Sequence, residues 1–245
     1  DHRDLHSFPT RRSSDLDVVF LSLPDGEAVR DVCLGSTGLI TVLNAGAIVV
    51  DLGTSPVALA RELDSRFREH GVQFSDAPVA RTRAAAEAGT LSIMVGAESR
   101  VFNTLEPLLR MMGEEITHCG TVGSGQLVKI MNNMVLFQTV SALAEALAIG
   151  RSAGIDPAVM FSALSKGSAD SFALRNHGMK AMLLDTFPQD AFSTAYAMKD
   201  LGYALELARD VGLDASGAQL VQDRFRQAID AGFHDSYFPV VSRVI

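Results

Sequence analysis

Residues 123–133 read GSGQLVKIMNN, a glycine-rich turn followed directly by an apolar helical run. Residues three and four apart share one face of a helix, so Lys129, Asn132 and Asn133 are expected to project together. An amine can donate or accept a proton on a bound oxygen, and neutral amides can orient that oxygen without adding charge. The alternative is an exposed polar stripe on an amphipathic helix, because most lysines are solvated.

Further segments follow a fixed order along the chain: DVVFLSLP at 17–24, VDLGTSP at 50–56, DAPV at 76–79 with GTL at 89–91, and KDL at 199–201. Together with Lys-x-x-Asn-Asn after GTVGSG, they resemble the β-hydroxyacid dehydrogenase family, which includes 3-hydroxyisobutyrate dehydrogenase and the related 6-phosphogluconate dehydrogenases. The resemblance runs from about residue 17 to the C-terminus. It implies an α/β fold, in which a partial Rossmann-like parallel sheet domain precedes an all-helical domain.

The first sixteen residues, DHRDLHSFPTRRSSDL, do not belong to this pattern. They are polar and lack the apolar run of a secretory signal, so we interpret them as a non-native or disordered segment. Family members begin with a strand and a Gly-x-Gly-x-x-Gly turn, and this motif does not occur in the sequence. The chain is therefore interpreted as N-terminally truncated. Because that turn holds the cofactor pyrophosphate, the chain is expected to bind a dinucleotide weakly. A truncated copy that catalyses nothing is therefore an open alternative.

Two domains follow, at residues 17–120 and 121–245. Continuous apolar runs that alternate with helical stretches predict a parallel sheet covered on both faces. The predicted strands are 18–23, 47–52, 72–79, 91–95 and 115–118, and the predicted helices between them are 26–34, 56–70 and 100–112. The second domain is expected to be helical and to serve substrate binding and dimerisation, with helices at 128–153, 157–164, 172–184, 191–211 and 215–231.

Composition excludes several classes of partner. The 245 residues are 47% hydrophobic and carry a net charge of −8, which argues against a nucleic-acid or anionic membrane surface. No run of eighteen apolar residues occurs, and Cys33 and Cys119 have no metal-ligand or disulfide spacing, so we assign no metal. The expected protein is cytoplasmic, binds a small anionic substrate and forms a homodimer or homotetramer.

The resemblance places the cofactor, NAD or NADP, against four residues. Leu23 and Pro24 end the first strand at the carboxyl edge of the sheet, where open α/β folds bind ligands, although a proline there can simply stop a strand. Thr54 lies where the family has a Ser-Thr pair near the nicotinamide, and its alternative role is a helix N-cap. Lys199 is implied to reach over the cofactor from the helical domain; an ordinary surface lysine is the alternative.

The predicted substrate site departs from the family at one place. The usual Ser-Gly-Gly after Asp-Ala-Pro-Val is replaced by Ala80, Arg81 and Thr82. A guanidinium is a bidentate donor for a carboxylate, sulfonate or phosphate, so Arg81 and Thr82 are expected to hold the anionic end of the substrate. Gly123 and Gly125 would let the backbone approach the substrate closely.

The predicted activity is hydride transfer between a nicotinamide and a small 3-hydroxy acid or its semialdehyde, with Lys129 as general acid/base. Besides the non-catalytic copy, two alternatives are open: a reductase of sulfolactaldehyde type with Arg81 on the sulfonate, and an imine reductase, against which the presence of Lys129 argues.

Overall fold

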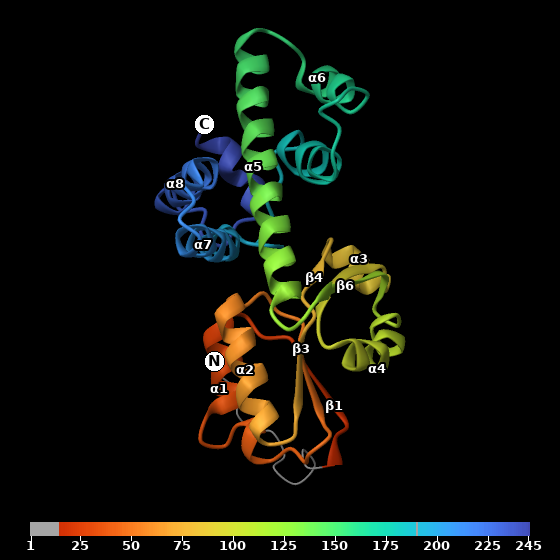
Figure 1. Ribbon diagram of the computed structural model, residues 1–245. Helices are drawn as coiled ribbons and strands as arrows, with labels where there is room; N and C mark the ends of the chain where they lie inside the picture. The colour runs from red at the N-terminus through yellow and green to blue at the C-terminus, as the bar shows by residue number, and fades with distance from the viewer. Residues whose placement is uncertain (1–14, 190) are drawn as a thin grey trace. The chain divides into compact units, whose positions relative to one another are not determined.

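The computed structural model describes residues 15–189 and 191–245 (Figure 1). The contacts divide the chain into two compact units, Asp1–Lys129 and Ile130–Ile245, and each is described by itself. Most of the segment interpreted as non-native, residues 1–14, lies outside the described residues. The domain boundaries drawn from the sequence stay predictions.

The first unit contains a six-stranded sheet. Its strands lie in the order β1 (Val18–Leu21), β2 (Ile48–Asp51), β3 (Gln73–Asp76), β5 (Leu91–Gly96) and β4 (Val79–Ala80), and β6 (Gly113–Gly120) pairs with β5. β1, β2 and β3 run parallel to one another, as do β5 and β6. The predicted α/β class with a mainly parallel sheet is confirmed.

One predicted strand, 72–79, was wrong: it forms two strands that pair with β5 in the antiparallel direction. Ala77 and Pro78 separate β3 from β4. Proline has no backbone N–H to give to a neighbouring strand, so the chain leaves the ladder there. The sheet is consequently mixed, and the antiparallel β5 brings the chain back beside the end of β3.

The helices of this unit follow the predicted order. α1 (Gly26–Leu34) has the predicted bounds, and the Asp25 carboxylate caps it by accepting a hydrogen bond from the N–H of Ala28 at 2.9 Å. α2 (Val57–Glu69) and α4 (Ser99–Leu109) are slightly shorter than predicted. The short helix α3 (Arg83–Glu87) and the 3₁₀ turn η2 (Leu39–Thr41) were not predicted.

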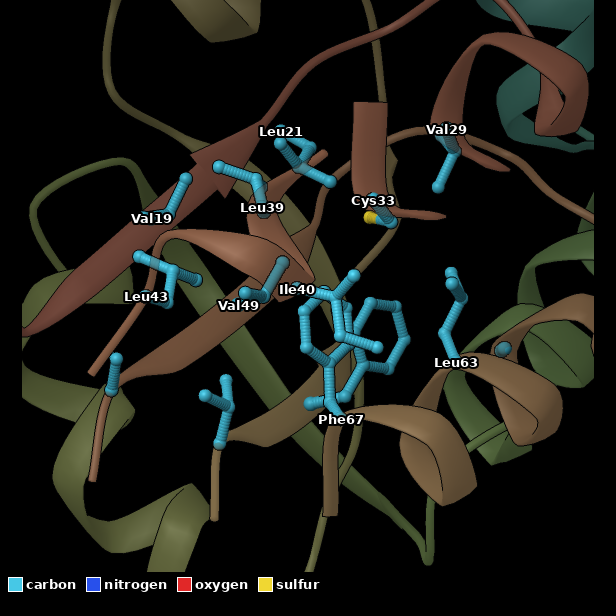
Figure 2. Packing of buried hydrophobic residues seen from close by; sticks show 14 of the residues in the cluster. Val19, Leu21, Val29, Cys33, Leu39, Ile40, Leu43, Val49, Leu63 and Phe67 are labelled. Atoms are coloured by element: carbon cyan, nitrogen blue, oxygen red, sulfur yellow. The ribbon is translucent and has the colours of Figure 1, made fainter. Parts of the chain in front are cut away.

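Apolar side chains cover both faces of the sheet. On one face, residues of β1, β2 and β3 pack against α1, η2 and α2; Figure 2 shows Val19, Leu21 and Val49 beside Cys33 and Phe67. On the other face, residues of β2 and β5 pack against the buried side of α4. Helices on both faces of a sheet leave the carboxyl ends of its strands as the place for ligands, and Leu23, Pro24 and Thr54 follow the ends of β1 and β2.

The second unit is helical. Its elements are α5 (Ser124–Ser152, continuous from the first unit), α6 (Pro157–Leu164), the π-helix η3 (Leu174–Met182), α7 (Thr194–Asp210), α8 (Ser216–Asp230) and the 3₁₀ helix η4 (Phe238–Arg243). Phe137 of α5 lies at the centre of its core, with ring centroids 5.4 Å from Phe225 of α8 and 5.2 Å from Phe238 of η4.

Among the described residues, α5 is long and apolar enough to cross a membrane by length and composition alone, with a mean hydropathy of 1.3. The core helix of a folded domain passes the same test, and 44% of that window is buried. The exposed remainder of the helix is considered below.

Candidate active site

The carboxyl ends of β1, β2 and β3 meet at one edge of the sheet, since Leu21, Asp51 and Asp76 are paired in register. The loops that follow β1 and β2 lie against each other there. The N–H of Leu52 donates to the carbonyl of Leu21 at 2.9 Å, and a Cβ atom on Gly53 would lie 3.0 Å from the carbonyl oxygen of Leu23. The structure therefore brings the Leu23–Pro24 loop and the Thr54 loop together.

Thr54 is not the N-cap of the next helix, which was the alternative reading of its position. α2 begins at Val57, and Pro56 occupies the cap without a side-chain hydrogen bond. A helix start at Pro56–Val57 leaves Thr54 in the loop at the carboxyl edge.

A buried carboxylate holds the first turn of α5. Asp76 is fully buried, and its two oxygens accept hydrogen bonds from the N–H groups of Gly123 and Gln126, both at 2.7 Å. A negative charge at this place is also stabilised by the positive end of the helix dipole. Burial raises the pKa of Asp76 to about 6, against the two hydrogen bonds that lower it, and nearby Asp51 raises it further.

Both predicted glycines are required by this docking of α5 on the sheet. Gly123 has φ +91°, a conformation that other residues adopt only with strain. A Cβ atom on Gly125 would lie 2.3 Å from the carbonyl oxygen of Met94 and 2.9 Å from that of Asp76. We predicted these glycines for close approach to a substrate; the structure shows that Gly125 permits close approach of the helix to the strands and that Gly123 supplies the positive φ of the turn before it.

Lys129 follows one turn later in α5 and is only 9% exposed. A solvated lysine on a polar stripe, the alternative interpretation, does not describe this side chain. Asn133, which lies four residues further along the same helix, is 2% exposed, whereas Asn132 is exposed.

In the second unit, Asn133 is held by a residue to which we had assigned no role. Its amide donates to the buried carboxylate of Asp200 on α7 at 2.7 Å, and its oxygen accepts from the amide of Asn132 at 3.0 Å. The other Asp200 oxygen lies 3.0 Å from the Lys199 amine. The contact is an ion pair, and it is not a hydrogen bond despite its length, because this oxygen accepts no hydrogen bond.

The predicted cofactor contact Lys199 lies among aromatic rings of its own helix. Its amine is 5.3 Å from the ring centroid of Tyr196 and 5.1 Å from that of Tyr203, and its side chain is 23% exposed. Residues three before and four after a helical lysine share its face, which explains the arrangement. The faces of both rings attract the positive charge of the amine.

Arg81 and Thr82 directly follow β4 in the chain. The Arg81 guanidinium donates to the carbonyl of Thr90 at 2.6 Å and lies 3.5 Å from the Glu114 carboxylate. Its φ is +88°, a conformation that glycine adopts far more readily than arginine, and the family pattern has a glycine at this position. The Thr82 hydroxyl oxygen accepts from the N–H of Ala85 at 3.3 Å and caps α3.

Two sequence families match this chain. The NAD binding domain of 6-phosphogluconate dehydrogenase matches residues 4–120, and the NAD-binding domain of NADP-dependent 3-hydroxyisobutyrate dehydrogenase matches residues 123–244. The 3-hydroxyisobutyrate dehydrogenase of Pseudomonas aeruginosa is 35% identical over 207 residues, which are 84% of this chain and 67% of that protein. The chain belongs to the 3-hydroxyisobutyrate dehydrogenase family.

Another relative of this dehydrogenase family member is the 2-(hydroxymethyl)glutarate dehydrogenase of Eubacterium barkeri, which is 36% identical over 79% of this chain. The chain spans 64% of the length of that relative, less than two thirds. Among solved structures, the Mycobacterium tuberculosis 3-hydroxyisobutyrate dehydrogenase with L-serine aligns with a TM-score of 0.86 and 29% identity, over 96% of this chain and 81% of that one.

Sequence reasoning about this family member missed three residues that organise the site: Asp76, Gln126 and Asp200. Asp76 and Asp200 lie inside the motifs that carried the resemblance, and Gln126 lies in the decisive stretch. An acidic residue in a buried run is a signal, because a buried carboxylate needs partners. The sequence does not say which N–H groups those partners are.

Proposed function

We propose that this protein is an oxidoreductase that transfers a hydride between NAD or NADP and a small 3-hydroxy acid or its semialdehyde. The nicotinamide, when bound, supplies or accepts the hydride. The observation that best supports this proposal is the placement of Lys129. It is buried one turn beyond the start of α5, which Asp76 fixes, and Asn133 lies on the same helix. A buried amine with amide neighbours suits an oxygen that gains and loses a proton.

The names of the relatives suggest the substrate class. Three compounds occur in those names: 3-hydroxyisobutyrate, 2-(hydroxymethyl)glutarate and L-serine. In each of them one carbon bears both a carboxylate and a hydroxymethyl group, and the compounds differ in the third group on that carbon. We propose that this chain acts on a substrate with the same hydroxymethyl carboxylate unit.

Each side chain then has a proposed task. Lys129 takes the alcohol proton as the alcohol is oxidised and returns it in the reverse reduction. Asn133 and Asn132 orient substrate oxygens, and the contact between Asn133 and Asp200 limits the rotation of that amide. Leu23 and Pro24, with Thr54 and Lys199, contact the cofactor; the adjacency of the loops after β1 and β2 supports a shared binding edge.

Arg81 and Thr82 are proposed to bind the substrate carboxylate near Gly123 and Gly125. Thr90 takes one N–H of the guanidinium, and a guanidinium has five, so a substrate anion can displace the 3.5 Å contact with Glu114. Binding in this way therefore requires the guanidinium to give up its contact with Glu114. A sulfonate could take the same place, although no contact in the structure favours it over a carboxylate.

Replacement of Lys129 tests the activity. In Lys129→Ala, kcat for the oxidation of 3-hydroxyisobutyrate is expected to fall about 10²–10⁴-fold, the usual contribution of a general acid/base. KM should change less than about tenfold if the lysine acts on the proton rather than on binding. Lys166→Ala, in an exposed turn of the helical unit, is the matched control. A Lys129→Ala protein that retains most of its kcat would remove this lysine from the mechanism.

We also propose a homodimer. Val128, Val135, Ala142 and Ile149 are all exposed and recur every seven residues along α5. A seven-residue repeat keeps apolar side chains on one helix face, as in the seam between paired helices. Two copies of the same stripe can therefore cover each other. Val135→Glu with Ile149→Glu should lower the mass measured by light scattering to that of a monomer, and Leu220→Glu on α8 should not.

A cytoplasmic location is proposed as well. Cys33 and Cys119 are both unpaired among the described residues, which suits a reducing compartment. Cell fractionation tests the location directly.

A further inference from the structure

Gln126 joins the loop after β2 to the first turn of α5. Its Oε1 accepts a hydrogen bond from the N–H of Ser55 at 3.0 Å, and its Nε2 donates to the carbonyl of Gly53 at 2.9 Å and to the carboxylate of Asp51 at 3.3 Å. A backbone N–H and a backbone carbonyl have opposite roles, so these partners settle the orientation of the amide. The side chain is fully buried.

The two elements that Gln126 connects both carry proposed site residues. The loop Gly53–Ser55 contains Thr54, and Lys129 lies three residues after Gln126 in α5, on the same side of the helix. Asp51 braces the loop further, because it accepts from the N–H of Gly53 at 2.9 Å and from the hydroxyl of Ser55 at 2.8 Å.

Asp76 fixes the same helical turn through the backbone N–H of Gln126. The turn is thus held at two levels: Asp76 sets the position of the main chain, and the Gln126 side chain sets its distance from the loop. A side chain used only for packing would not require three polar partners in a buried place, since each unmet group there would be costly.

We propose that Gln126 is a positioning residue, which holds the Thr54 loop and the Lys129 turn at a fixed separation. The expected effect on turnover rests on the proposed function, whereas the fixed separation of the loop and the turn does not. If Gln126 is lost, the loop and the turn should loosen together while the rest of each unit keeps its structure.

Three variants separate this role from a general structural one. Gln126→Leu removes all three side-chain hydrogen bonds at similar volume. Gln126→Glu keeps an acceptor for Ser55 but loses the donors, and its protonated form regains one donor. Gln138→Leu, on the same helix in the other unit, is the matched control, because it makes the same substitution outside residues 53–55 and 124–129.

Amide hydrogen exchange gives the first measurement. Peptides that cover residues 53–55 and 124–129 should exchange at least about tenfold faster in Gln126→Leu, because local opening needs less free energy. The control should match the wild type. In Gln126→Glu, protection should recover as the pH falls from about 8 to about 5.5, near the range in which a buried glutamate becomes protonated. The recovery is scored against wild type at the same pH, because Asp51 and Asp76 face this network and Asp76 also titrates there.

The second measurement follows Lys129 itself. The chain has four lysines, Lys129, Lys166, Lys180 and Lys199, so ¹³Cε labelling gives four resolvable side-chain signals. The Lys129 signal should shift and broaden in Gln126→Leu, while the other three stay in place. A role in folding alone would not move one lysine signal selectively.

Turnover gives the third measurement. A displacement of about 1 Å can cost about 10²-fold in rate, so kcat should fall between about tenfold and 10²-fold with KM nearly unchanged. If the wild type does not oxidise 3-hydroxyisobutyrate, the proposed function fails, and the exchange and lysine signals still decide the role of Gln126. Unchanged exchange in both segments, or equal loss of protection throughout the first unit, overturns the inference; if Gln126→Leu does not fold, Gln126→Glu decides by whether its protection recovers with acid.

Discussion

Gly125→Ala is the sharpest test of how α5 docks on the sheet. The added methyl would lie 2.3 Å from the carbonyl oxygen of Met94, 2.8 Å from the N–H nitrogen of Gly96 and 2.9 Å from the carbonyl oxygen of Asp76. Ordinary contacts of this kind lie at about 3.5 Å, so the helix start must retreat by about 1 Å. All three neighbours are main-chain atoms, which cannot rotate away.

Overpacking of this kind typically costs about 1–3 kcal/mol, and rigid neighbours place Gly125→Ala near the upper end. The better helix propensity of alanine offsets up to about 1 kcal/mol, which leaves a net loss of about 2 kcal/mol. Gly202→Ala on α7 is the control: nothing lies within 4 Å of its added methyl, so a gain of about 0.4–1 kcal/mol is expected.

Urea unfolding measures both changes. Far-ultraviolet circular dichroism follows the whole chain, whereas tyrosine fluorescence follows the helical unit alone, because the three tyrosines lie at 196, 203 and 237. For a loss of about 2 kcal/mol the midpoint of the first unit should fall by about 1 M. If Gly125→Ala unfolds at the same urea concentration as Gly202→Ala, the close approach of α5 to the strands is refuted.

Other outcomes follow from single contacts. Arg81→Gly should be more stable than Arg81→Ala by about 1–3 kcal/mol, since φ is +88°, while both should lose substrate kcat/KM if Arg81 binds the anion. Asp200→Ala leaves the Asn133 amide without its buried partner and should lower unfolding free energy by about 1.5–3 kcal/mol, with Asp200→Asn less affected; equal effects of both would contradict the charged contact. Burial lowers the pKa of His177 to about 4, helped by the Lys180 charge, so the unfolded chain binds a proton that the folded chain excludes. The stability of the wild type should therefore decline by up to about 3 kcal/mol as the pH falls from 6.5 towards 4, and that of His177→Leu should not. The unfolding midpoint measured across this pH range shows the difference. Tyr237→Phe removes the 2.5 Å contact to the imidazole but keeps the titrating group, so it should retain the decline.

The sequence by itself determined the order of the longer helices and of most strands, and the position of Lys129 relative to Asn132 and Asn133. These features are local: apolar runs, glycine turns and a helical spacing of three and four residues depend only on near neighbours in the chain. The same reasoning predicted α1 and α6 with the bounds that the structure has. It also placed Leu23, Pro24 and Thr54 near one edge of the sheet, because the ends of parallel strands meet there.

The tertiary structure alone decided which groups hold the site together. Asp76 lies 47 residues before Gly123 in the chain, Asp51 lies 75 before Gln126, and Asp200 lies 67 after Asn133. No local pattern specifies such pairs, because they depend on how the strands turn and where a helix start comes to rest. The antiparallel return of β5 after Pro78 is of the same kind: local propensity favoured one long strand, and the missing N–H of the proline together with pairing to a distant segment divided it.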